Sequence, residues 1–145
     1  MMKLFLSLAA LSGLIAVAAG GFGVHGLESS VSERELKAFE TGACYQMYHA
    51  LALAVAALVA GQYPSRAVTV AGWSFAIGTL LFIGPLYVMG LTGSRALVMV
   101  TPIGGLGFMI GWAALFVAAP SSGRPPKMAA TARASMMTAR ARFCL

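Results

Sequence analysis

The sequence predicts an all-α fold, an integral membrane four-helix bundle with a short interfacial amphipathic helix between the first two spans. Four stretches without charged residues support it, over residues 4–24, 43–61, 67–91 and 96–119. Each is long enough to cross a hydrocarbon core of ~30 Å as a helix rising ~1.5 Å per residue. Only 10% of the 145 residues are charged and 59% are hydrophobic. A soluble protein with so few polar residues could not cover four such helices.

The first apolar stretch has two interpretations. It follows Lys3 and contains Ala16-Val17-Ala18, which resembles the cleavage site of a secretory signal. The apolar run continues past Ala18 to Val24, however, whereas the apolar core of a signal peptide usually has ~7–15 residues. We therefore expect a retained first helix, with cleavage as the alternative.

The connection between the first two spans carries a strong signal for the start of a helix. Ser32 suits the N-cap position, and Glu35 three residues later completes a capping box. Apolar and charged residues then alternate with helical spacing, which predicts an amphipathic helix over residues 32–41, lying in the membrane interface. We expect Gly42 to end this helix before the second span.

The other connections, residues 62–66 and 92–95, are short and therefore predict antiparallel neighbouring spans. We expect one membrane domain over residues 1–119 and a basic, disordered tail over residues 120–145. Half of the ten Lys and Arg residues lie in this tail, namely Arg124, Lys127, Arg133, Arg140 and Arg142.

Orientation follows from the distribution of Lys and Arg. Four spans place both termini on one side, and that side holds Lys3, Arg66 and the tail. The other side holds Arg34, Lys37 and Arg95. This imbalance of seven against three predicts that both termini are cytoplasmic, and it rests on the tail, because the count without the tail is two against three. A basic tail beside a bilayer favours orientation or contact with anionic lipid, so the net charge of +6 does not indicate a nucleic-acid partner.

The two cysteines exclude a disulfide framework. The predicted orientation places Cys44 and Cys144 on opposite sides of the membrane, where they cannot pair.

Small residues inside the spans predict close helix packing. In lipid, helices associate where small side chains let two backbones approach. The candidates are Gly72, Ala76, Gly104, Gly105, Gly107 and Gly111. We expect packing inside one subunit, with a homo-oligomer contact as the alternative. Pro85 and Pro102 are expected to kink their helices.

Polar side chains gather at the start of the second span. Tyr45, Gln46 and His49 are spaced three and four residues apart, so they share one helix face, and His25 ends the first span on the same side of the membrane. A two-His metal or haem site, a polar packing network and a proton or solute site are the open interpretations. Two histidines without a fixed carboxylate or thiolate are a weak metal signal, so we expect the packing network and no metal or cofactor.

Catalytic signatures are missing from the sequence. No span contains a carboxylate, which argues against a proton relay, and there is no phosphate loop, nucleophile elbow or HExxH motif. We therefore expect no catalytic residue and no enzyme activity.

Five ordered strings carry a family resemblance: GFGVHGL (21–27), TGACYQMYHALAL (41–53), FIGPLY (82–87), LTGSR (91–95) and PIGG (102–105). Together they resemble the small membrane proteins grouped as domain of unknown function 423, which include the eukaryotic transmembrane protein 256. The resemblance covers about residues 1–119 and departs in the tail. It implies four membrane helices in a bacterial inner membrane or an organelle, and it implies no reaction.

The leading functional hypothesis is a non-enzymatic interaction protein of the lipid bilayer, an accessory or assembly partner of a larger membrane complex. The alternative is a permeation unit for small solutes or ions that acts as a homo-oligomer, with Tyr45, Gln46 and His49 lining the path. The third is a haem or metal protein that uses His25 and His49 as ligands.

Overall fold

A computed structural model describes residues 1–119, and these form four long helices and two short helical segments. They are α1 (Met2–Phe22), the π-helical turn η1 (Gly23–Leu27), α2 (Glu33–Gln62), α3 (Arg66–Thr92), the 3-10 turn η2 (Val98–Val100) and α4 (Thr101–Ala118). Four helices are long and apolar enough to cross a membrane. This confirms the predicted all-α, four-span fold. The expected tail, residues 120–145, lies outside the described residues.

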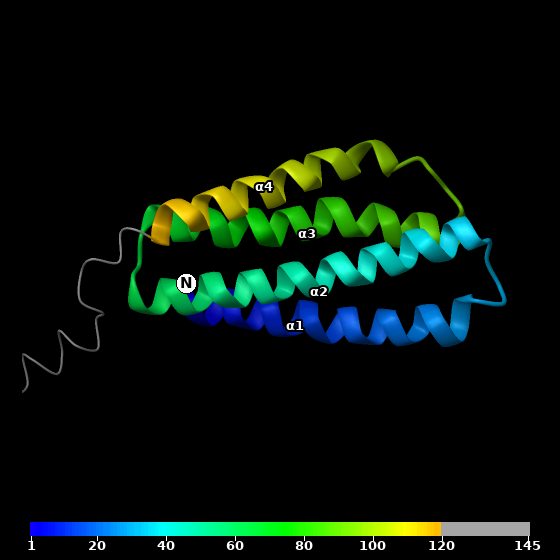
Figure 1. Ribbon diagram of the computed structural model, residues 1–145, viewed down its shortest axis with the longest axis horizontal. Coiled ribbons are helices and arrows are strands. Elements are labelled where there is room, and N and C mark those ends of the chain that lie inside the picture. The colour runs from blue at the N-terminus through cyan, green and yellow to red at the C-terminus, as the bar shows by residue number, and fades with distance from the viewer. Residues whose placement is uncertain (120–145) are drawn as a thin grey trace, which may run out of the picture.

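The helices form an open up-and-down bundle in sequence order. α1 packs on α2, α2 on α3 and α3 on α4, and α1 and α4 lie at opposite edges of the assembly (Figure 1). The start of α1, the turn between α2 and α3 and the end of α4 share one end of the molecule. The central pair, α2 and α3, supplies most of the buried residues.

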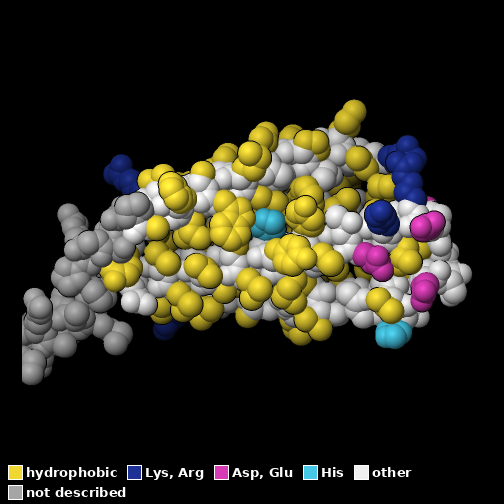
Figure 2. Space-filling view, viewed as in Figure 1, with side chains coloured by type: hydrophobic (Ala, Val, Ile, Leu, Met, Phe, Trp, Pro, Cys, Tyr) yellow, Lys and Arg dark blue, Asp and Glu magenta, His cyan; other side chains and the backbone are white. Residues whose placement is uncertain are grey.

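The core is built from aromatic rings set among alanines. Phe5 of α1 and Phe75 of α3 are fully buried, and Ala56, Ala57 and Ala71 pack around them. Removal of residues 1–18 would take Phe5 out of this core. Apolar side chains also cover the middle of the outer surface, while the acidic side chains and part of the basic ones gather at the end opposite the start of α1 (Figure 2). Such a surface suits contact with lipid tails.

The capping box predicted at Ser32 is confirmed, but the helix does not end at Gly42. The backbone N–H of Ser32 donates to Glu35 Oε2 at 2.8 Å, and the Glu35 N–H donates to Ser32 Oγ at 3.4 Å. The helix then continues through Gly42 to Gln62, so the amphipathic segment forms the first turns of α2. Gly42 is buried, and a Cβ there would lie 3.0 Å from the Tyr87 ring. This glycine admits a neighbouring ring, and helix packing offsets the ~1 kcal/mol that glycine costs in a helix interior.

The start of α2 packs against the end of α3. Gly93 caps α3 in the left-handed region at φ 69°, and its N–H donates to the Met89 carbonyl. Glu35 lies beside Gly93, and Phe39 lies against Gly90. The two helix termini are thereby joined at the charged end of the bundle.

The two prolines occupy different settings. Pro85 is buried inside α3, which continues on both sides of it. Pro102 lies in the first turn of α4, because residues 96–100 form a loop and a 3-10 turn in place of helix. In the first turn of a helix, proline removes no intrahelical hydrogen bond. The expectation that Pro102 kinks the fourth span is therefore corrected: it starts the helix.

The small residues of α4 face α3 within the same chain. A Cβ on Gly104 would lie 2.7 Å from the Leu81 carbonyl carbon and closer still to the Phe82 backbone. A Cβ on Gly107 would lie 3.3 Å from the Gly78 Cα. Gly105 differs, because its nearest neighbours are Phe82 ring atoms at 3.7 and 3.8 Å.

Further contacts of this kind involve rings. A Cβ on Gly111 would lie 2.6 Å from the Phe75 ring, and Gly72 receives the Phe5 ring of α1. Ala76 is half-buried and packs beside the core. Most of the small residues singled out from the sequence are thus used inside the protomer.

The contrast between Gly104 and Gly105 gives a test of this packing. Gly104→Ala should lower the free energy of unfolding by ~1–3 kcal/mol, because backbone atoms of α3 cannot yield to the added methyl group. Gly105→Ala should change it by less than ~0.5 kcal/mol. Reversible unfolding in mixed micelles, followed by circular dichroism, measures both. Equal stability of the two variants would contradict the described α3–α4 contact.

Candidate functional site

His49 of α2 lies in an aromatic cluster inside the bundle. Its side chain is 7% exposed and stacks on the Phe108 ring of α4 at a centroid distance of 3.4 Å and an angle of 9°. The Phe75 ring of α3 is 6.0 Å away. The His49 Nδ1–H donates to the Tyr45 carbonyl at 2.8 Å. His49 therefore acts as a buried ring that links three helices.

Gln46 lies on the same helix and bonds to α3. Its side chain is 5% exposed, and its Oε1 accepts a hydrogen bond from the Tyr87 hydroxyl at 2.5 Å. The Tyr87 ring also packs on Phe39 at 4.8 Å. The pair joins α2 to α3 within the membrane-spanning part of the bundle.

Tyr45 lies beside these residues but faces outward. It is exposed, and its ring stacks on Phe82 at 5.1 Å and on His49 at 6.1 Å. The structure thus brings Tyr45, Gln46 and His49 together as the sequence spacing predicts, with Tyr45 at the lipid-facing edge.

His25 does not join this cluster. It is exposed on η1, and its neighbour Gly23 approaches the Phe39 ring, where a Cβ would lie 3.3 Å away. His49 follows Phe39 by ten residues, which is ~15 Å along α2. The two-His metal or haem hypothesis is therefore corrected by geometry. Within residues 1–119, no group of three or more His, Cys, Asp or Glu side chains could hold a metal ion.

Sequence reasoning missed Tyr87, Phe75 and Phe108, which complete the cluster. One signal was present for Tyr87, because a tyrosine inside an apolar span needs a partner for its hydroxyl. The two phenylalanines are indistinguishable in the sequence from lipid-facing ones. Their position depends on which face of α3 and α4 turns inward.

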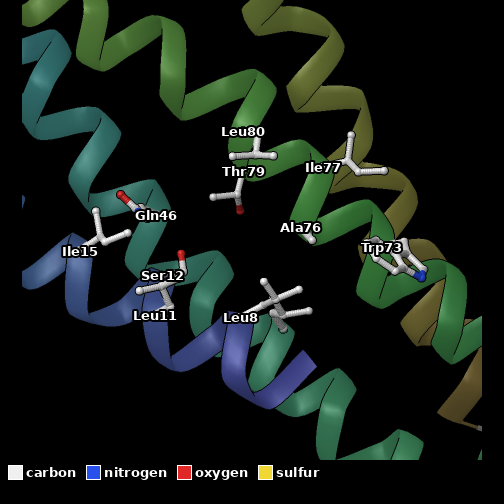
Figure 3. A pocket seen from close by; sticks show the side chains of 11 residues that line it. Leu8, Leu11, Ser12, Ile15, Gln46, Trp73, Ala76, Ile77, Thr79 and Leu80 are labelled. Atoms are coloured by element: carbon white, nitrogen blue, oxygen red, sulfur yellow. The ribbon is translucent and has the colours of Figure 1, made fainter. Parts of the chain in front are cut away.

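A groove opens beside Gln46. It has a volume of ≈ 250 Å³, runs between α1 and α3, and is lined by apolar side chains together with Ser12, Gln46 and Thr79 (Figure 3). A second hollow of ≈ 540 Å³ lies between α3 and α4 and is lined mostly by apolar side chains. The first groove combines an apolar wall with several polar groups, as small-molecule sites do.

Comparison with known proteins identifies the family. A sequence model described as "Protein of unknown function (DUF423)" matches residues 19–105. UPF0382 membrane protein YwdK of Bacillus subtilis is 43% identical over 119 residues, which cover 81% of this chain and 97% of that protein. The chain belongs to the DUF423 family.

A UPF0382 membrane protein of Staphylococcus aureus, SAB0533, is similar to this DUF423 chain at 44% identity over 117 residues, covering 81% of this chain and 95% of its own length. These names confirm that the family consists of membrane proteins. The region matched by the DUF423 model includes the whole of α2 and α3, and therefore Gln46, His49 and Tyr87. No solved structure matches the chain.

The bond between Gln46 and Tyr87 can be measured directly in this DUF423 protein. Tyr87→Phe and Gln46→Leu should each reduce stability, and the double variant should lose less than the sum, because either change alone breaks the bond. Hydrogen bonds between membrane helices show coupling energies of ~0.6 kcal/mol on average and up to ~1.7. A double-mutant cycle of unfolding in micelles measures the coupling. Strict additivity would contradict the bond.

Proposed function

We propose that this protein is a non-enzymatic interaction protein of the membrane, an accessory or assembly partner of a larger complex. The observation that carries the proposal is the open bundle, in which α1 packs mainly on α2 and α4 mainly on α3, and both keep long apolar faces on the outside. Val17 of α1 is 65% exposed and Phe116 of α4 is 77% exposed. In lipid, another helix can cover such a face through packing and hydrogen bonds.

The polar groups inside the spans support interaction over catalysis. Gln46 Oε1 is bonded to Tyr87, and His49 is stacked on Phe108 and bonded to the Tyr45 carbonyl. These side chains serve the packing of α2 against its neighbours. The alternative of solute permeation gains no such support, because its proposed path residues are engaged within the protomer or, for Tyr45, face outward.

We also propose that the chain lies in the cell (inner) membrane with both termini in the cytoplasm. Lys3 and Arg66 lie at the end of the bundle where α1 starts and α4 ends, whereas Arg34, Lys37 and Arg95 lie at the opposite end. The basic tail follows α4. Its five Lys and Arg residues turn a count of two against three into seven against three, and the more basic side of a membrane protein faces the cytoplasm.

Cysteine labelling tests the orientation. In a Cys44→Ser, Cys144→Ser background, Ser30→Cys places a thiol in the loop before α2, and Gln62→Cys places one at the opposite end. A membrane-impermeant maleimide should label Ser30→Cys in intact spheroplasts and Gln62→Cys only after lysis. The reverse pattern would show that the termini lie outside.

Photo-crosslinking tests the interaction itself. A benzophenone amino acid at Val17 or Phe116 should form a discrete protein adduct in the membrane, and native mass analysis in mild detergent should show the same partner bound. The matched control is the same amino acid at the fully buried Phe75, which should give no intermolecular adduct. Lipid adducts alone at both outer positions, with a monomeric mass, would contradict the proposal.

A further inference from the structure

Ser12 and Thr79 lie at the same level across the groove between α1 and α3. The two helices run parallel, since they are the first and third of an up-and-down bundle, and Phe5 packs over Gly72. Ser12 follows Phe5 by seven residues, and Thr79 follows Gly72 by seven residues. In parallel helices, equal steps from a contact lead to the same level. Both line the groove, and both hydroxyl oxygens point toward the space between the helices (Figure 3).

Gln46 lines the groove about one helical turn further toward the charged end. Its neighbour Tyr45 stacks on Phe82, three residues beyond Thr79 on α3. The Gln46 backbone thus lies roughly one helical turn, ~5.4 Å, beyond the level of the two hydroxyl-bearing residues.

These polar groups lack partners among the described residues. Ser12 Oγ is enclosed and has no hydrogen bond, and the Gln46 side chain bonds only through its oxygen, which leaves both amide hydrogens free. Thr79 forms no side-chain hydrogen bond within residues 1–119 either, unlike Thr69 and Thr92, which bond back to the preceding helical turn. In hydrocarbon no water satisfies such groups, so an unpaired donor in this place favours a ligand that can accept.

The depth and the access of the groove restrict that ligand. Gln46 follows Glu40, the last charged residue of α2, by six residues, or ~9 Å, which lies below a headgroup layer of ~5–7 Å. The mouth is bordered by Leu11 and Leu80, which are exposed on the lipid-facing surface. No charged side chain lines the groove. The occupant therefore enters from the bilayer and carries no charge where it binds.

We propose that this groove binds a neutral, lipid-soluble quinone, a six-membered ring with two carbonyl groups. One carbonyl accepts from the Gln46 amide and the other from the Thr79 hydroxyl, while the apolar tail leaves between α1 and α3. Ser12 Oγ is enclosed and joins Thr79 once its side chain turns about the Cα–Cβ bond toward the groove. A groove of ≈ 250 Å³ is too small for a helix ~10 Å across but holds a substituted ring. An ester phospholipid fits less well, because its charged headgroup holds its carbonyls above the level of Ser12. The proposal concerns binding alone and does not depend on the proposed interaction function.

Trp73 lines the groove and serves as the reporter. The probe is a decyl-substituted benzoquinone, titrated into the full chain carrying Trp112→Phe in quinone-free nanodiscs, so that Trp73 is the only tryptophan. Saturable quenching of Trp73 fluorescence is expected. Decylbenzene, which has the tail without carbonyls, should not compete, and neither should a diacylglycerol. Quenching that never saturates, or equal competition by either of these molecules, would overturn the proposal.

Variants distinguish a site that binds through hydrogen bonds from one that binds only through apolar contact. Gln46→Leu and Thr79→Val should each weaken binding at least tenfold. Ser74→Ala, which lies in the other hollow, should change binding by less than threefold. Unchanged binding in both groove variants would refute the hydrogen-bonding role. Size-exclusion elution and circular dichroism confirm folding, and Thr79→Val keeps the side-chain shape should Gln46→Leu fail to fold.

Ser12→Ala gives a second test, which measures thermal stability with and without quinone. Without quinone it should leave the melting temperature unchanged or raise it, because it removes an unpaired buried hydroxyl. The stabilisation that added quinone gives to the parent chain should shrink in this variant. A lowered melting temperature without quinone, together with full stabilisation by quinone, would show that Ser12 serves packing and would contradict its role in the site.

Discussion

Close backbone contact between α3 and α4 positions the buried rings of the bundle. Gly78 and Gly104 meet where a side chain on either would strike the opposite helix, and Gly107 extends the contact by one turn. Only at this separation can Phe108 reach past α3 to stack on His49 of α2. Because helices in lipid gain nothing from leaving water, such contact replaces the hydrophobic drive of a soluble core.

α1 also contacts α3 at a glycine, but this contact leaves a groove between the two helices. Phe5 inserts over Gly72 and fixes α1 against α3 near the start of both helices. One to two turns further on, no ring fills the space, and Ser12 and Thr79 border the groove. The Phe75, His49 and Phe108 rings thus fill the interior between α2, α3 and α4, whereas between α1 and α3 the groove stays open. This asymmetry separates the packing cluster around His49 from the groove beside Gln46.

Much of the fold was readable from the sequence because its determinants are local. Uncharged length predicts a span wherever the helix lies, and the capping box at Ser32 depends on residues three positions apart. Gly42 and Pro102 were misread because their effect depends on neighbours. Gly42 stays helical because the Tyr87 ring packs against it, and Pro102 is harmless because α4 begins one residue earlier.

The candidate site shows the same limit. Helical spacing grouped Tyr45, Gln46 and His49 correctly, because all three lie on one helix. Spacing could not exclude His25, since the path of η1 and the loop decides how far it lies from α2. Nor could it find Phe108 or Tyr87, which reach the cluster only after α3 and α4 have packed. Contacts between helices depend on which face of each helix turns toward the bundle interior. An almost uniformly apolar sequence gives little indication of that face.

Gln46 belongs both to the packing contact between α2 and α3 and to the groove beside α1. Its amide oxygen and its amide nitrogen have different surroundings. Its oxygen is held by Tyr87, which fixes the side chain against α3. Its nitrogen has no partner among residues 1–119, and the side chain lines the groove. An apolar residue at this position would lose the bond to Tyr87 but would leave no free donor in hydrocarbon. The amide can therefore serve both tasks, because its oxygen joins α2 to α3 and its nitrogen is available to the ligand proposed for the groove.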